Sequence, residues 1–123
     1  ITFFSGTQAA VAPLNQVLSI YNGSRALVGQ TADDTSTAWA ANTAKTLSFA
    51  TPVTIQTTGL HYIGISVAVT TTVPSLSGAT KLVQITNVVP ILHGTSTGSL
   101  TATMPATAAA ITGAASAVYA TLQ

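Results

Sequence analysis

The sequence predicts an all-β fold, a single jelly-roll-like antiparallel β-sandwich of about seven or eight short strands. Apolar residues recur at every second position along several segments, turn-forming residues separate these segments, and no segment carries the apolar stripe of an amphipathic helix. Threonine is abundant, and its branched Cβ suits a pleated sheet. With 47% hydrophobic residues, we expect residues 1–123 to form one domain with one core. Because Ile1 is not an initiator methionine, we expect the chain to begin at a processed or fragment end.

The first two predicted strands form a hairpin. Residues 14–21 place Leu18 and Ile20 in alternation with polar residues, and the segment ends at Asn22-Gly23. Asn-Gly favours a type I′ turn, in which both central residues have positive φ. Residues 24–30 are then the returning strand.

The middle of the chain predicts three more strands. Residues 45–49 and 53–55 alternate on either side of Pro52, whose missing amide hydrogen marks a sheet edge or a break. A turn at residues 57–59 leads into residues 60–69. This last segment puts its large aliphatic residues on one face and small residues on the other, which predicts a central strand with a close neighbour on its small side. The large residues are Ile63, Ile65, Val67 and Val69, and the small ones are Gly64, Ser66 and Ala68.

The remaining segments predict strands joined by long loops. Alanine favours a helix over residues 106–117, but the Thr, Ser and Gly residues within that segment weaken a helix, so a non-helical structure is favoured. The predicted strands are residues 81–89, 100–104 and 118–122, and the predicted surface loops are residues 33–42 and 73–80.

Charge is scarce in this chain: three Lys or Arg and two Asp or Glu make five charged residues, or 4%. A typical soluble domain is about 25% charged, so a chain this neutral belongs in lipid or inside an assembly. A spanning helix needs about 20 consecutive apolar residues, and polar residues interrupt the two most apolar segments, residues 60–73 and 106–122. Three scattered cations make no surface for phosphates. We therefore expect neither a membrane nor a nucleic acid as partner.

The residues suited to catalysis or metal binding are few. The chain has no cysteine and no G-x-S-x-G motif, and its acids, Asp33 and Asp34, are adjacent, whereas glycosidase carboxylates face each other across a sugar. We expect no enzyme activity, no catalytic residue and no cofactor. A calcium ion needs six to eight oxygens, so a solvated turn at residues 33–36 is favoured over a calcium site, and no metal site is expected at His61 and His93 either.

Trp39 follows the acidic loop. An exposed indole stacks well on a sugar ring, although aromatic residues of a small β-domain mostly lie in the core, so burial is favoured. Trp39, Asp33 and Asp34 form the candidate glycan or surface contact.

Five segments together resemble small β-sandwich modules of virion proteins in tailed phages, particularly those that infect actinobacteria. They are residues 18–28 (LSIYNGSRALV), 37–39 (TAW), 45–47 (KTL), 51–55 (TPVTI) and 59–64 (GLHYIG). In those modules a similar hairpin, a Trp-bearing loop and a Gly-x-Tyr-Tyr strand recur, and His61 here replaces the usual aromatic or small residue.

The resemblance covers about residues 14–122 and rests on turn and strand motifs. It implies a non-enzymatic structural protein of a bacteriophage virion, as a capsid decoration or head-fibre domain or as a minor-tail or tail-fibre module. The expected partners are copies of the chain itself, as a homotrimer, and other virion proteins.

Two other functions stay open on the sequence. A carbohydrate-binding receptor-recognition module would hold a host-surface glycan through Trp39 and the Asp33-Asp34 loop. An ice-binding surface is suggested by Thr-x-Thr pairs at residues 35–37, 95–97 and 101–103, but these pairs lack a regular period.

Overall fold

The structure is a computed structural model that describes residues 1–35, 37–80, 94–96, 98, 101–114 and 116–122. It confirms the all-β prediction: the described residues form antiparallel sheets and contain no helix, hence none that could cross a membrane. The strands are β1 (Thr2–Phe4), β2 (Val11–Asn22), β3 (Leu27–Gln30), β4 (Ala44–Thr46), β5 (His61–Thr72), β6 (Gly78–Thr80), β7 (Gly94–Ser96), β8 (Ile111–Gly113), β9 (Ser116–Val118) and β10 (Ala120–Thr121).

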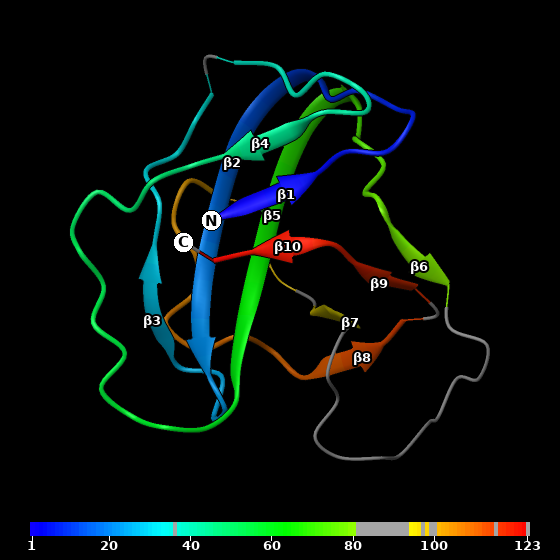
Figure 1. The fold of residues 1–123 in the computed structure, drawn as a ribbon. Coiled ribbons are helices and arrows are strands. Elements are labelled where there is room, and N and C mark those ends of the chain that lie inside the picture. Colours follow the sequence, from blue (N-terminus) through cyan, green and yellow to red (C-terminus); the bar gives the residue numbers. More distant parts are fainter. Residues whose placement is uncertain (36, 81–93, 97, 99–100, 115, 123) are drawn as a thin grey trace.

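One sheet has the order β3-β2-β5 and contains the two longest strands (Figure 1). β2 and β5 pair at ten positions, from Val11↔Thr72 to Asn22↔His61. β2 lies between β3 and β5, whereas β5, which residues 60–69 were predicted to form as a central strand, has a neighbour on one side only among the described strands. The burial of β2 on both faces from Gln16 to Tyr21 fits its central place.

The alternation along β5 is confirmed. Its large aliphatic residues pack against the core cluster of Ile1, Phe3, Ala10, Leu18, Ile20 and Trp39. On the opposite, small face, Gly64 pairs with Ser19, and a Cβ added at Gly64 would lie 2.6 Å from Ser19 Oγ. The large face of β5 therefore packs against the core, and the small face lies on the opposite side of the sheet.

The second sheet has the order β10-β1-β4 and crosses in front of the first in Figure 1. Phe3 of β1, 1% exposed, points into the core between the two sheets, which is the arrangement of a sandwich. The jelly-roll connectivity remains a prediction. Two small ladders, β6 with β9 and β7 with β8, lie beside these sheets in Figure 1.

The predicted hairpin joins β2 to β3, but its turn is of another type. Arg25, not Gly23, has positive φ, at 66°. The Arg25 N–H donates to the Asn22 carbonyl at 2.8 Å, and the Asn22 side-chain oxygen accepts from the N–H groups of Ser24 at 3.0 Å and Ala26 at 2.9 Å. This is a three-residue loop followed by a bulge, so the type I′ prediction is wrong.

Several other predicted elements differ from the structure. Residues 53–55 form no strand, and Val53 packs over Gly29, where an added Cβ would meet its Cγ2 at 2.5 Å. The strand predicted at residues 45–49 is the shorter β4, and residues 101–104 are irregular. The last strand is split at Tyr119, whose N–H donates to the Ser77 carbonyl at 2.9 Å. Residues 106–114 and 116–117 are non-helical, as predicted, and the predicted strand at residues 81–89 lies outside the described residues.

The loop predictions have mixed outcomes. Residues 33–42 have no strand in their described part, as predicted. Residues 73–80 are more ordered than a surface loop, because they contain β6 and a bridge from Leu76 to Ser5. The turn at residues 57–59 is present, with Gly59 at φ 130°.

Candidate functional site

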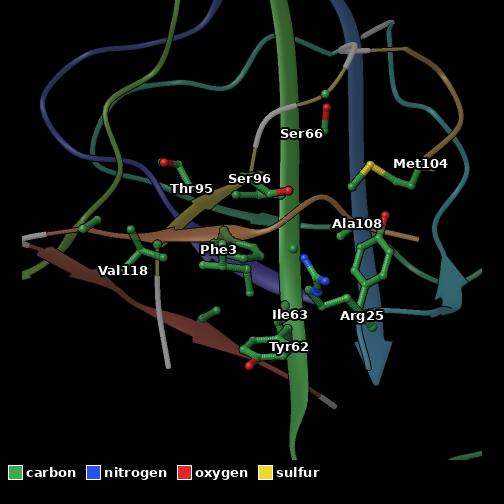
Figure 2. Close-up of a pocket in the computed structure, with 18 of the residues that line it drawn as sticks. Phe3, Arg25, Tyr62, Ile63, Ser66, Thr95, Ser96, Met104, Ala108 and Val118 are labelled. Carbon is green, nitrogen blue, oxygen red and sulfur yellow. The ribbon is translucent and has the colours of Figure 1, made fainter. Parts of the chain in front are cut away.

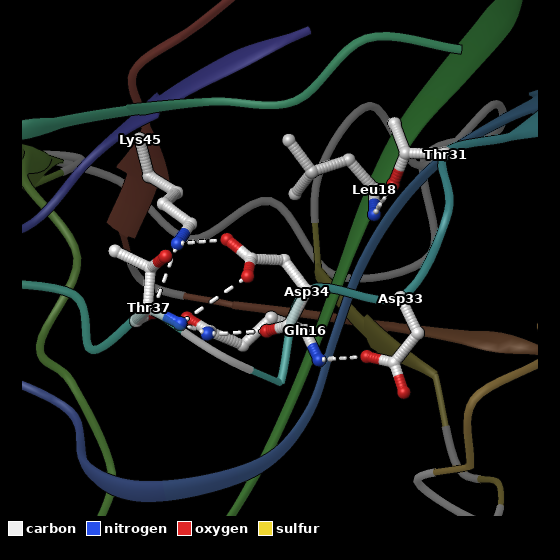
Figure 3. A network of polar contacts seen from close by, with 7 residues as sticks. All are labelled: Gln16, Leu18, Thr31, Asp33, Asp34, Thr37 and Lys45. Atoms are coloured by element: carbon white, nitrogen blue, oxygen red, sulfur yellow. Dashed lines mark hydrogen bonds and ion pairs between the residues drawn. The ribbon is translucent and has the colours of Figure 1, made fainter. Parts of the chain in front are cut away.

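The acidic loop is fastened to strand β2. Asp33 accepts a hydrogen bond from the Gln16 N–H at 2.7 Å, and the Asp34 N–H donates to the Gln16 carbonyl at 3.0 Å (Figure 3). Two residues earlier, the Thr31 hydroxyl accepts from the Leu18 N–H at 3.1 Å. The loop thus continues the backbone pairing of β2 after β3 has ended.

Asp34 forms an ion pair with Lys45 of β4. Lys45 Nζ lies 2.5 Å from Asp34 Oδ2 and also donates to the Thr37 carbonyl at 3.0 Å. The two side chains are 10% and 20% exposed, for Lys45 and Asp34 respectively. Lys45 pairs with Phe3 in the sheet and shares its inward face, so the ammonium group reaches the loop from inside.

Gln16 completes this network. Its amide nitrogen donates to the carbonyls of Asp34 at 2.6 Å and Thr37 at 2.7 Å (Figure 3). The prediction of a solvated turn is wrong at Asp34, whose carboxylate pairs with Lys45 at 20% exposure, whereas Asp33 is half-exposed. Among the described residues, no three His, Cys, Asp or Glu side chains gather to hold a metal ion.

Sequence reasoning missed Lys45 and Gln16 as partners of the acidic loop. One signal was present, because Lys45 alternates with the apolar Leu47 and Phe49 on one strand face. A cation on an inward face needs an anion, and the chain has only two acids to offer.

Trp39 lies in the core at 2% exposure, which confirms its predicted burial. Its indole N–H donates to the Thr43 carbonyl at 3.3 Å, and its carbonyl accepts from the Ala10 N–H at 2.8 Å. A sugar cannot stack on a ring that the core covers. The structure therefore separates Trp39 from any surface contact made by Asp33 and Asp34.

A cavity of about 620 Å³ lies around β5, away from the acidic loop (Figure 2). On the large face of β5 its lining includes Phe3, Ile63 and Leu76. On the small face it includes Tyr21, Arg25, Tyr62, Ser66 and Met104. The lining also includes His61, Thr95 and Ser96, so the cavity is mostly apolar with several polar groups among the apolar ones.

Segment 104–108 closes the small-face side, because it is bonded to the β2–β3 hairpin. The Tyr21 hydroxyl donates to the Pro105 carbonyl at 3.0 Å, and burial raises the pKa of this phenol above its ordinary value. The Leu27 N–H donates to the Ala106 carbonyl, and the Ala108 N–H to the Arg25 carbonyl. Sequence reasoning missed this site because its walls come from distant parts of the chain.

The described charges all lie at least partly inside the protein. Arg25, Asp33 and Asp34 are half-buried and Lys45 is buried, so no charged residue of the described chain is fully exposed.

Comparisons with protein-family models, curated proteins and solved structures found no match to the chain.

Proposed function

We propose that this chain is a non-enzymatic structural module of a phage virion that packs against copies of itself and other virion proteins. The observation that carries the proposal is the placement of charge: no charged residue of the described chain is fully exposed, and Lys45 and Asp34 form an ion pair at 10% and 20% exposure. Exposed charge normally keeps isolated domains apart in solution. A surface with little exposed charge suits a subunit whose faces are covered by other subunits in an assembly.

The outer face of the β10-β1-β4 sheet offers a surface for such packing. Phe4 is 38% exposed there, next to Ala44, its paired residue on β4. Tyr119, the residue between β9 and β10, is 56% exposed. Two exposed aromatic residues beside uncharged neighbours can be buried against another subunit at little desolvation cost.

The assignment to a virion is supported by the resemblance of residues 18–28, 37–39 and 59–64 to tailed-phage modules. A capsid decoration or head-fibre domain and a tail-fibre module both use many copies of one chain. Labelled antibodies imaged on particles of the phage that encodes the chain test the location directly. Labelling on the head or tail supports the proposal, and unlabelled particles contradict it.

Self-association is tested by light scattering coupled to size exclusion at micromolar concentration. We expect an oligomer that persists from low salt to about 1 M salt, because neutral contacts are not screened. Phe4→Glu should dissociate it by placing a charge in the contact. Ser24→Glu, in the exposed β2–β3 loop, is the matched control and should leave it intact. A wild-type monomer under these conditions would count against the proposal.

The carbohydrate-binding alternative loses its aromatic contact, because Trp39 is buried. Asp33 and Asp34 are half-buried and bonded within the protein. A glycan array remains the test, and Trp39→Ala is unsuitable for it since this substitution opens the core.

A further inference from the structure

We propose that the cavity around β5 binds a small organic carboxylate with an apolar body, and that Arg25 holds the carboxylate. This ligand site is independent of the structural role proposed above. It rests on the position of one cation, on the supply of anions in the chain and on the lining of the cavity.

Arg25 lies in the loop that joins β2 to β3, and its backbone is held there by two hydrogen bonds. Its N–H donates to Asn22 at 2.8 Å, and its carbonyl accepts from the Ala108 N–H at 2.9 Å, so its backbone is held on both sides. Figure 2 shows its side chain extending toward β5. The φ of 66° is in a region where glycine or asparagine is common and a long side chain is rare. A non-glycine residue held there is a reason to look for a function of its side chain.

No acidic side chain of the chain is left to pair with Arg25. The sequence has two acids. Asp34 pairs with Lys45, and Asp33 accepts from the Gln16 N–H in the acidic loop, which does not line the cavity. Arg25 is half-buried and lines the cavity, and a guanidinium among apolar side chains gains a charge-assisted hydrogen bond when an anion meets it. An external anion supplies what the sequence lacks.

The rest of the lining selects the body of that ligand. Phe3, Ile63 and Leu76 offer an apolar wall, and Met104 on the other side is flexible enough to adapt to different shapes. The volume of about 620 Å³ is in the range of small-molecule sites. The described lining has no carboxylate to compete for the guanidinium, and its neutral polar groups include the hydroxyls of Thr95 and Ser96. One cation suits a singly charged carboxylate better than a doubly charged phosphate.

Octanoate is the probe, with 1-octanol as its uncharged analogue, and binding is measured by calorimetry and amide NMR shifts on the intact protein. We expect saturable octanoate binding with shifts at Arg25, Ser66 and Met104. Octanol should bind about tenfold more weakly or worse, because a charged hydrogen bond contributes about 1.5–3 kcal/mol.

Arg25→Gly is the decisive variant, because glycine relieves the positive φ and so keeps or raises stability while removing the guanidinium. We expect it to bind octanoate about ten- to a hundredfold more weakly. Arg25→Lys should give an intermediate affinity since it keeps the charge without the bidentate geometry. The proposal is overturned if octanoate shows no saturable binding, if octanol binds equally well, or if Arg25→Gly binds octanoate as tightly as the wild type.

Discussion

Replacing Lys45 with methionine tests the internal ion pair most directly. Methionine fills a similar volume but offers no donor, so Asp34 loses its contact at 2.5 Å and the Thr37 carbonyl loses one at 3.0 Å. Removing one partner of a buried pair costs about 3–5 kcal/mol, since the other charge stays desolvated. The side chains of Lys45 and Asp34 keep 10% and 20% exposure, so we expect the lower end, about 3 kcal/mol.

Urea unfolding at neutral pH and one fixed protein concentration measures this loss. The double variant Lys45→Met with Asp34→Leu should recover much of it, because no carboxylate is then left unpaired. Ser48→Met is the matched control at an exposed position nearby and should stay within about 0.5 kcal/mol of the wild type. A loss under about 1 kcal/mol for Lys45→Met would show that water screens the pair as it screens a surface salt bridge, and would refute the reasoning.

Three further substitutions probe the β2–β5 sheet and its hairpin. Gly64→Ala puts a methyl group 2.6 Å from Ser19 Oγ and should cost about 1–3 kcal/mol in thermal unfolding, whereas Gly98→Ala, with nothing within 4 Å, should cost less; equal losses would contradict this. Asn22→Ala removes the acceptor of two loop N–H groups and should lower the free energy of unfolding by about 1–2 kcal/mol, and an unchanged urea midpoint would rule out that role. Burial raises the pKa of Tyr21, so its contribution to stability is complete below about pH 10 and is lost as pH rises through the folded-state pKa; Tyr21→Phe should make alkaline unfolding less steep, and an identical pH profile would count against it.

The strongest sequence patterns predicted the parts of the fold that local chemistry decides. The alternation of residues 60–69 predicted strand β5 and its apolar face, because residues two apart share one face of a strand but not one face of a helix. The hairpin after Asn22 was also predicted from a local signal, the Asn22-Gly23 pair between two strand-like segments. In both places the signal lies within about ten neighbouring residues.

Other features depend on partners far away in the chain. Gly23 was expected to take the positive φ, but the Asn22 side chain instead organises the loop so that Arg25 takes it. Which strand is central depends on pairing partners, and alternation does not reveal them. Val53 lies over Gly29 and so contributes to packing without a strand, although its local pattern matches a strand equally well.

The count of charges in the sequence and their positions in the structure lead to different conclusions. Five charges suggest a protein that lacks charge for solubility, but the structure gives three of the four described ones specific partners: Asp34 with Lys45, and Asp33 with the Gln16 N–H. Because Asp33 and Asp34 both bind groups at the acidic loop, neither of these two acids neutralises Arg25. Neutral outer faces and an unmatched guanidinium are therefore both results of the same shortage. The first favours packing against other subunits, and the second favours an anion from outside the chain.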